Sequence, residues 1–519
     1  MPASSPPAPV APDGDGHLKR GVLGTGSLVF MVVAAAAPLT VMAGVAPLAI
    51  LVGGVGAPVA YLASGVVLTV FAVAFTRMTR HVGSAGAFYA YVAKGLGRTW
   101  GLAAALLALM AYNALMIGVY GLFAVQAQAT LADVFGVTVP WPVVALVAVA
   151  LVLLVGWLGI DVGARVLGVL LALETGILLL MAIGVLAAGG ASGLDAASFT
   201  ADAVFSPGMA GVLAFSFAAF MGFESTVLYR KEARDPERTV PRATYLAVGF
   251  MAVTYCFIVW SVVQAFGSDQ AVAAAEGDLA GMFFAAIETY VGPWASTLMH
   301  LLVVSSVYAS QIAFHNAINR YAFALSRDGV LPRWVGTVHP RFGSPYRAGL
   351  LQTALAVVVI VVFAVAGADP YEQLLLWVNT PGVVGVLVLQ TMTAAATVAY
   401  FVRRNRAAAT PVAIGAGVAS GVLLAAATLL LVDHIELLTA ASTTVNVLLV
   451  GIVPLTLAIG TACALWLRAH RPERYAGIGG GRGRRCHPRP ATAHHHRRPL
   501  RRRPLWTPTW SSRPTPCTP

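Results

Sequence analysis

Charged residues are scarce in this chain of 519 residues. They make up 10% of it, against about 25% in a typical soluble domain. Hydrophobic residues make up 58%, and the mean hydropathy is +0.79. So few polar side chains cannot cover a soluble globule of this size. The composition therefore argues against a water-soluble enzyme, a disordered chain and a fibrous protein.

Cysteine is also rare, and recognisable catalytic motifs are absent from the sequence. Cys256 and Cys463 lie in apolar segments, Cys486 and Cys517 lie near the end, and no spacing indicates a disulfide framework or a zinc site. The body of the chain has no Walker loop, no nucleophile elbow and no metal-ligand pattern. The histidines at 494–496 lack a folded context. We therefore expect no enzyme activity, no cofactor and no bound metal.

Acidic residues are fewer than basic ones, 21 against 33, which gives a formal net charge of +12. Alone, that excess would suggest a nucleic acid or an anionic membrane surface as a partner. Twelve of the arginines, however, lie in Ala469–Pro519 with a single acid, Glu473, and the rest of the chain is nearly neutral. We therefore expect no nucleic-acid partner.

Both ends of the chain are expected to be disordered and cytoplasmic. Segment 469–519 has few aliphatic residues and cannot build a core. Its end is either a tail that binds anionic lipids or an out-of-frame translation of GC-rich DNA after about Gly477. Residues 1–20 are rich in Pro, Ala and Ser, and they do not resemble a signal peptide, because no cleavage site follows a short apolar run.

Long apolar runs dominate the remainder of the chain. Each is long enough to cross a bilayer, and each must be a helix, because backbone polar groups in hydrocarbon have to be bonded within their own segment. We expect an all-α integral membrane protein with twelve transmembrane helices. They lie at about 21–49, 52–76, 100–129, 141–160, 162–188, 209–229, 243–265, 294–323, 348–367, 374–402, 411–432 and 443–468.

Basic residues in the loops fall on one side of this twelve-helix arrangement. Arg77, Arg230 and Arg403 are examples from alternate connections, whereas the other connections hold acids such as Asp195 and Asp369. Since basic loops stay in the cytoplasm, we expect both termini there, in a multi-pass protein of the plasma membrane.

Breaker residues occur in mid-span at two equivalent places. The helix at 21–49 enters from the cytoplasm and the helix at 209–229 enters from outside, so two five-helix units are inverted relative to each other. Pro38 and Gly44 interrupt the first helix, and Gly222 interrupts the second. Discontinuous helices in inverted halves indicate a transporter whose site lies at the midplane.

Three stretches resemble the amino acid permeases of the amino acid–polyamine–organocation transporter superfamily. FAAFMGFESTVLYRKEARDPERTVPRA, from Phe217, is similar to helix 6 of that family and its following loop. RMTRHVGSAGAFYAYVAKGLGRTWG, from Arg77, is similar to the loop after helix 2, and NAINRYAFALSRDGVLPRW, from Asn316, to the end of helix 8. The resemblance implies a LeuT-like 5+5 inverted repeat at 21–402, with two peripheral helices at 403–468.

The interrupted helices and the resemblance together define a candidate site. Free N–H groups at one half-helix start suit a carboxylate, and free carbonyls at the other half's end suit an ammonium group. Where the family has a Gly-Ser-Gly-like sequence this chain has Pro38-Leu39-Thr40, and a kink that serves packing alone is the alternative. The candidate substrate-binding residues are Ala37, Pro38, Leu39, Thr40, Val41, Gly44, Asn113, Phe217, Ala218, Phe220, Met221, Gly222, Phe314 and Asn379.

Packing alone explains two of these candidates equally well. Asn113 would then bond a neighbouring helix, and Phe314 would be an ordinary core aromatic. In helix 10, Pro381-Gly382 marks a further candidate break close to Asn379.

Two carboxylates lie within apolar segments, where such groups are costly and usually functional. By resemblance Glu224 is a candidate residue for gating and proton coupling near the substrate, and capping of the broken helix is the alternative. Glu174 is a candidate proton carrier, or else it bonds a neighbouring helix or a lipid headgroup. Ser306 and Ser310 share a helix face and form a candidate sodium site, with ordinary hydroxyl-to-backbone hydrogen bonds as the alternative.

These features predict a secondary active permease for an amino acid or a related small amine, coupled to H+ or, as the alternative, to Na+. A carrier of polyamines or other organic solutes, or an exchanger of the same fold, is the competing hypothesis. A non-transporting membrane sensor would need a soluble output domain, which we do not expect here. The expected partners are the small-molecule substrate and the lipid bilayer, and the sequence does not predict the oligomeric state.

Overall fold

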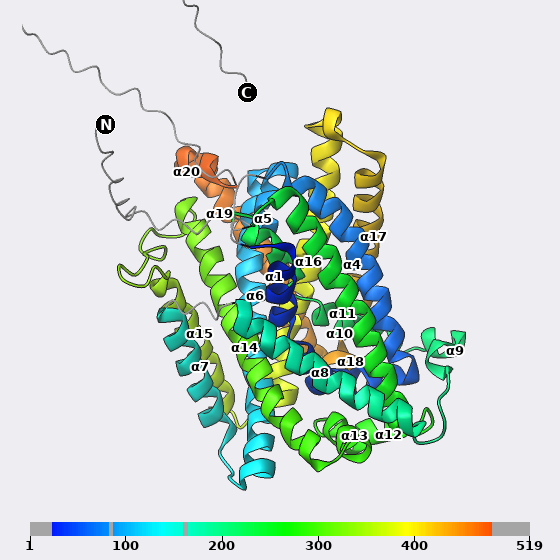
Figure 1. Cartoon of the computed structure of the whole chain (residues 1–519). Helices are drawn as coiled ribbons and strands as arrows, with labels where there is room; N and C mark the ends of the chain where they lie inside the picture. Colours follow the sequence, from blue (N-terminus) through cyan, green and yellow to red (C-terminus); the bar gives the residue numbers. More distant parts are fainter. Residues whose placement is uncertain (1–22, 83–86, 159–163, 232, 480–519) are drawn as a thin grey trace, which may run out of the picture. The chain divides into compact units, whose positions relative to one another are not determined.

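Helices account for nearly all of the regular structure (Figure 1). The computed structural model describes residues 23–82, 87–158, 164–231 and 233–479. Within these ranges the one exception is an isolated backbone bridge between Leu23 and Ala233. Eleven helical segments in this part of the chain are long and apolar enough to cross a membrane. The prediction of an all-α membrane protein is confirmed at this level.

The eleven segments correspond to eleven of the twelve predicted helices. The remaining one, predicted at 141–160, is α7 (Trp141–Trp157), which has 17 residues and is shorter than the others. The candidate spans are Thr25–Gly44, Ala46–Thr79, Arg98–Phe135, Gly168–Ala188, Met209–Val227, Pro236–Phe266, Pro293–Arg327, Tyr346–Val365, Pro370–Arg403, Pro411–Asp433 and Thr443–His470.

Four of the spans consist of more than one element. The first contains α1 (Thr25–Ala36) and α2 (Pro38–Gly44), and the second contains α3 (Ala46–Gly53), η1 (Gly54–Gly56) and α4 (Ala57–Thr79). Two later spans pair α10 (Met209–Ala219) with η3 (Phe223–Lys231), and η4 (Pro370–Trp377) with α16 (Val378–Arg403). The second span begins before the predicted residue 52 because it includes α3, although the backbone turns at Gly54, with φ +65° and ψ −155°, and α4 itself begins at Ala57.

Single helices form the other spans, and short elements lie in the connections. The single helices are α6 (Arg98–Phe135), α8 (Ala164–Ala188), α11 (Pro236–Phe266), α14 (Pro293–Arg327), α15 (Tyr346–Val365), α17 (Pro411–Asp433) and α19 (Thr443–His470). The short elements are α5 (Ala87–Gly95), η2 (Ala197–Phe199), α9 (Ala201–Val204), α12 (Ala271–Gly277), α13 (Met282–Tyr290), η5 (Arg406–Ala408), α18 (Ile435–Thr439) and α20 (Pro472–Gly477).

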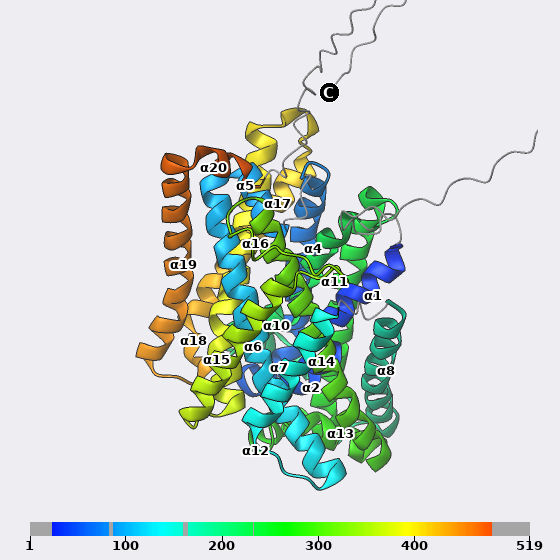
Figure 2. The same ribbon diagram turned by 90° about the vertical axis from the view of Figure 1, so that its left-hand side faces the viewer.

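The long helix α6 lies inside the bundle, where it packs against α14, α16 and α19 (Figures 1 and 2). In its apolar stretch 67% of the residues are buried, against 22% in α17 and 17% in α19. Large apolar side chains such as Val422 and Leu448 remain exposed on those two helices. Such a surface suits lipid, whereas α6 is in a position to contribute side chains to an internal site.

Pro381 does not interrupt its helix, so the prediction of a break at Pro381-Gly382 is wrong. The wide π-helical turns of η4 end just before α16. The hydroxyl of Thr380 donates to the carbonyl of Leu376 at 2.8 Å. These local adjustments satisfy backbone groups near the proline, which is how membrane helices tolerate this residue.

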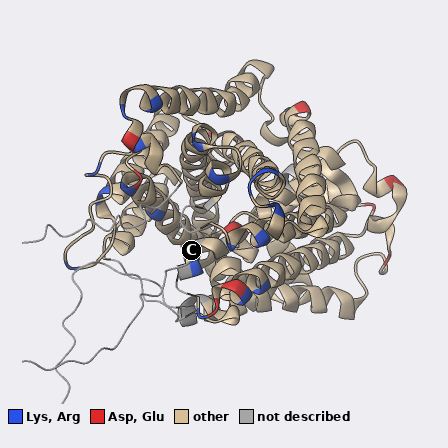
Figure 3. Ribbon diagram, turned by 90° about the horizontal axis from the view of Figure 1, so that it is seen from above, with Lys and Arg blue, Asp and Glu red and all other residues tan. Residues whose placement is uncertain are grey.

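Lysine and arginine residues lie mostly at one end of the bundle, which we call the basic end and which Figure 3 shows from above. It comprises the C-terminal ends of α4, α14, α16 and α19 and the N-terminal ends of α6, α11 and α15. The connections at the opposite end, which we call the acidic end, carry residues such as Asp195 and Asp369.

The chain continues in ordered form beyond residue 469, where the disordered tail was predicted to begin. Helix α19 extends to His470, α20 follows, and Ile478 is 2% exposed. The N–H of Gly479 donates to Asp328 Oδ2 at 3.2 Å. Burial raises the pKa of the Asp328 carboxyl, although this hydrogen bond acts in the opposite direction. Residues 1–22 and 480–519, which include the proposed out-of-frame tail, lie outside the described residues.

Candidate functional site

The first interruption lies at Ala37, between α1 and α2. Ala37 has a φ of +49°, in the left-handed region that alanine rarely adopts, and Pro38 starts the next helix without an N–H group. The N–H of Ala37 donates to the carbonyls of Val33 and Ala34, at 3.1 and 3.2 Å, and so ends α1. The helix is therefore broken at the place that Pro38 predicts.

The carboxylate of Glu174, on α8, lies against this interruption. Its Oε2 atom accepts a hydrogen bond from Ser306 Oγ at 2.7 Å, and Ser306 Oγ accepts one from Thr40 Oγ1 at 2.9 Å. The side chains of Glu174, Ser306 and Thr40 are buried. One polar cluster thus joins α2, α8 and α14.

The second interruption lies between α10 and η3 and is built around Gly222. This residue has a φ of +110°, a conformation that glycine adopts without strain. Its N–H donates to Glu224 Oε2 at 3.1 Å, and the hydroxyl of Tyr112 donates to Glu224 Oε1 at 2.5 Å. Glu224 is 2% exposed. Its carboxylate therefore caps the broken helix and also reaches across to α6.

Tyr112, and not its neighbour Asn113, hydrogen-bonds Glu224 at the second interruption. Asn113 Nδ2 donates to the carbonyl of Leu109 in its own helix at 2.7 Å. The ring of Tyr112 also lies 6.2 Å from that of Tyr321 on α14, measured between centroids. In the sequence a tyrosine in an apolar helix looks like a core residue, so no sequence signal distinguished Tyr112 as the partner of Glu224.

The other predicted residues occupy varied positions around the two interruptions. Phe217, Phe220 and Met221 are buried at the end of α10, and Ala218 is partly exposed. Val41 is buried within α2.

Gly44 closes α2, and its carbonyl accepts a hydrogen bond from Tyr371 at 2.8 Å. Asn379 lies against Gly118 of α6, where an added Cβ would be 2.5 Å from Asn379 Oδ1. Phe314 packs at the edge of the apolar core, and Ser310 is buried one turn beyond Ser306.

Two buried tyrosines without any distinguishing sequence signal pack beside the second interruption. The ring of Tyr255, on α11, lies 5.7 Å from Phe220 and 5.9 Å from Tyr61 between centroids. Among the described residues neither tyrosine hydroxyl has a hydrogen-bond partner. Tyr255 thus packs between α4 and the end of α10.

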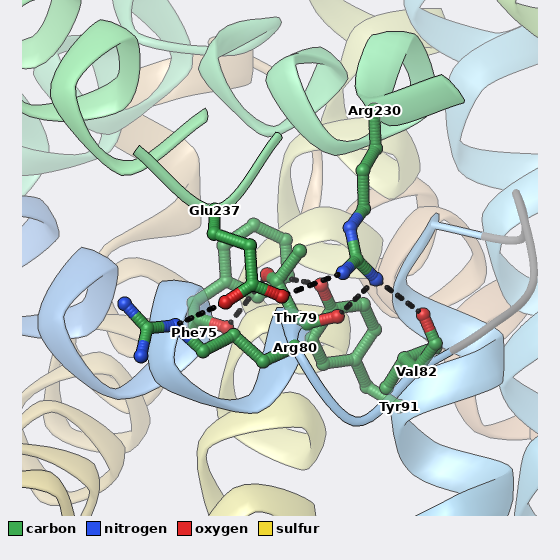
Figure 4. A network of polar contacts seen from close by, with 7 residues as sticks. All are labelled: Phe75, Thr79, Arg80, Val82, Tyr91, Arg230 and Glu237. Atoms are coloured by element: carbon green, nitrogen blue, oxygen red, sulfur yellow. Dashed lines mark hydrogen bonds and ion pairs between the residues drawn. The ribbon is translucent and has the colours of Figure 1, made fainter. Parts of the chain in front are cut away.

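A polar network at the basic end joins the elements that follow the second interruption to α4. Arg230, in η3, donates to the carbonyl oxygens of Thr79 at 2.5 Å and Val82 at 3.0 Å (Figure 4). Glu237, on α11, lies 3.5 Å from Arg80 and 3.7 Å from Arg230. The exposed ion pairs are individually weak. Together with the carbonyl contacts they hold η3, α11 and the end of α4 in one arrangement.

These features define a class of protein: a multi-pass helical membrane protein with interruptions at Ala37 and Gly222, each of which has a buried carboxylate close by. In the described part of the chain no group of three or more His, Cys, Asp or Glu could hold a metal ion. The sequence profile of the amino acid permeases, described as "Amino acid permease", matches residues 27–475. The chain belongs to the amino acid permease family, and the resemblance drawn from the three motifs is confirmed.

Several curated relatives carry transporter names. An uncharacterized transporter of Mycobacterium tuberculosis is 29% identical over 166 residues, which are 32% of this chain and 37% of the relative. The L-lysine transport protein of Corynebacterium glutamicum is 26% identical over 30% of this chain and 29% of the relative. The low-affinity putrescine importer of Escherichia coli is 27% identical over 58% of this chain and 66% of the relative. The match to the mycobacterial relative covers little more than a third of its length.

Proposed function

We propose that the protein is a secondary active transporter of the plasma membrane that moves an amino acid or a related small amine by alternating access, coupled to protons. The family and the names of the relatives support transport rather than enzymatic activity. In this proposal α7 also crosses the membrane, which brings the number of transmembrane helices to twelve. The ten of them that lie before residue 403 form the LeuT-like 5+5 repeat. The basic end faces the cytoplasm, because basic loops are retained there.

The position of Glu174 is the observation that supports coupling of transport to protons. Its carboxylate accepts a hydrogen bond from Ser306 of α14, and the Ser306 hydroxyl in turn accepts one from Thr40 of α2. An ionised carboxylate accepts such hydrogen bonds more strongly than a protonated one. Uptake of a proton therefore loosens α2 from α8 and α14, and its release tightens the contact. Rocking of one helix group against another is the motion that alternating access requires.

We take the proton as the coupling ion because the buried carboxylate of Glu174 can itself take one up and release it. Sodium stays the alternative. Glu224 and Tyr112 then form a gate beside the substrate, since their contact crosses from the second interruption to α6.

Uptake into proteoliposomes tests the proposal. An inward proton gradient should drive accumulation of at least one labelled compound from a panel of amino acids and small amines, and Glu174→Gln should abolish the response to the gradient. Glu288→Gln, an exposed acid on α13, is the matched control and should behave like the wild type. Uptake that follows Na+ and not pH would overturn proton coupling, and no uptake from the whole panel would overturn transport.

An exchanger, or a carrier of polyamines or other organic solutes, is the second candidate function. The long match to a protein named as a putrescine importer favours an amine. Liposomes preloaded with the unlabelled compound separate the two modes, because an exchanger needs internal substrate and a proton-driven importer does not.

A further inference from the structure

The loop between α14 and α15 is held in one arrangement by hydrogen bonds. The hydroxyl of Ser326 donates to the carbonyl of Pro332 at 3.0 Å, which ties the loop back to α14. Within the loop, the N–H of His339 donates to the carbonyl of Ser344 at 2.8 Å. The hydroxyl of Ser344 donates to the carbonyl of Trp157, the last residue of α7, at 2.9 Å. The loop is therefore fixed to both helices.

A cluster of aromatic rings stiffens the second half of this loop. Between centroids, the ring of His339 lies 4.8 Å from that of Phe342 and 5.5 Å from that of Tyr346. The ring of Tyr346 lies 5.2 Å from that of Trp157. The guanidinium group of Arg341 lies over the Phe342 ring, 5.4 Å from its centroid, which is within the range of a cation–π contact. The packed rings thus hold Arg341 in place.

The side chains that this loop exposes are basic and aromatic. Arg333, Trp334 and Arg341 are exposed, and the exposed fraction of Trp334 is 49%. The ion pairs among the described side chains involve neither arginine. Asp328 is the one acid in segment 328–345, and its carboxylate accepts hydrogen bonds from two other parts of the chain. Two guanidinium groups therefore reach the surface of the described structure without a carboxylate partner.

The loop lies beside a helix whose surface suits lipid. Helix α15 begins directly after the loop and packs against α7 at the edge of the bundle (Figure 1). In its apolar stretch 28% of the residues are buried, and large side chains such as Leu351 and Leu355 are exposed. A loop at the end of such a helix lies at the level of the lipid headgroups. Tryptophan, with an apolar ring and a polar N–H group, is enriched at that level.

We propose that this loop binds the headgroup of an anionic phospholipid at the basic end. A guanidinium group offers paired donors that match the oxygens of a phosphate. Arg333 and Arg341 bind the phosphate, and Trp334 packs where the headgroup meets the acyl chains. The two positive charges favour a lipid with net negative charge over a zwitterionic one, whose ammonium group they repel. Anionic lipids are abundant in the cytoplasmic leaflet, which the basic end is proposed to face. This binding does not depend on which compound the protein transports.

Lipid titration of the purified full-length protein in detergent micelles tests this proposal. Phosphatidylglycerol and phosphatidylcholine with identical acyl chains are added, and the bound lipids are counted by native mass spectrometry. The wild type should bind phosphatidylglycerol at least about tenfold more tightly, since each basic residue near the surface contributes to the attraction of anionic lipid. The double variant Arg333→Gln with Arg341→Gln should lose most of this preference. Equal binding of the two lipids by the wild type would overturn the proposal.

A second double variant separates this loop from the general charge of the basic end. Arg403→Gln with Arg404→Gln removes two exposed arginines from the end of α16 and should keep the preference for phosphatidylglycerol. A loss as large as that in the loop variant would overturn the assignment to the loop. Inorganic phosphate, added as a competitor at the concentration of the lipid, should displace little of it. Displacement of most of the lipid would show that the arginines bind a free anion, and would overturn the assignment of a lipid.

Discussion

The substitution Tyr112→Phe measures how much the hydrogen bond between Tyr112 and Glu224 contributes to the free energy of unfolding. Tyr112 donates to Glu224 Oε1 at 2.5 Å, and both side chains are buried, at 9% and 2% exposure. A hydrogen bond to a charged group contributes about 1.5–3 kcal/mol, and one between neutral groups contributes about 1 kcal/mol. We therefore expect Tyr112→Phe to lower the free energy of unfolding by about 2 kcal/mol in the wild type.

The same substitution should cost less in the Glu224→Gln background. Glutamine keeps an acceptor oxygen but has no charge, so Tyr112→Phe there should cost about 1 kcal/mol. The difference of about 1 kcal/mol between the backgrounds is the coupling that the carboxylate charge adds. Tyr120→Phe, about two turns further along α6, removes another buried tyrosine hydroxyl and is the matched control.

Denaturant titration of the purified variants in detergent, followed by tryptophan fluorescence, gives these free energies. The four proteins of the cycle and the control are measured in one micelle composition, because detergent alters the unfolded state. Equal costs of Tyr112→Phe in the two backgrounds would refute the idea that a charged Glu224 holds Tyr112. A cost no larger than that of Tyr120→Phe would refute the contact itself.

Three further predictions follow from other contacts. Ser306→Ala should strongly reduce proton-driven uptake, because it disconnects Glu174 from α2 and α14, whereas Ser305→Ala loses only a bond to its own helix and should transport normally. Gly118→Ala places a Cβ 2.5 Å from Asn379 Oδ1 and should cost about 1–3 kcal/mol in unfolding free energy. Gly176→Ala meets no atom within 4 Å and should not destabilise. Truncation after residue 479 should leave uptake unchanged, whereas truncation after 470 removes the buried Ile478 and should lower the thermal midpoint; equal midpoints would contradict this.

Local signals in the sequence were sufficient to predict most of the helices and the positions of the two interruptions. An apolar run of bilayer length specifies a helix by itself, because hydrocarbon offers no other partner for its backbone. Pro38 and Gly222 impose local backbone constraints that neighbours cannot remove. Pro381 shows the limit of such signals, since the π turns before it and the Thr380 hydroxyl accommodate the proline within a continuous helix.

The candidate site depends on contacts between residues that are far apart in the sequence, and no local sequence pattern predicts such contacts. Glu174 and Ser306 are 132 positions apart, and Tyr112 and Glu224 are 112 apart. Each pair meets only because separate helices pack at a particular rotation and depth, which the summed packing of the bundle decides. The sequence suggested Asn113 on α6 as a residue of the substrate site, and only the rotation of that helix in the packed bundle directs its neighbour Tyr112 to Glu224.

The sequence by itself determined that this protein is a helical membrane protein of the permease type, that helices break near Pro38 and Gly222, and that Glu224 lies at the second break. These properties depend on hydrophobicity and backbone chemistry along short segments. The tertiary structure alone decided which donors Glu174 and Glu224 take. Hydrogen bonds depend on distances of a few tenths of an ångström between distant segments, and only the packed bundle sets those distances.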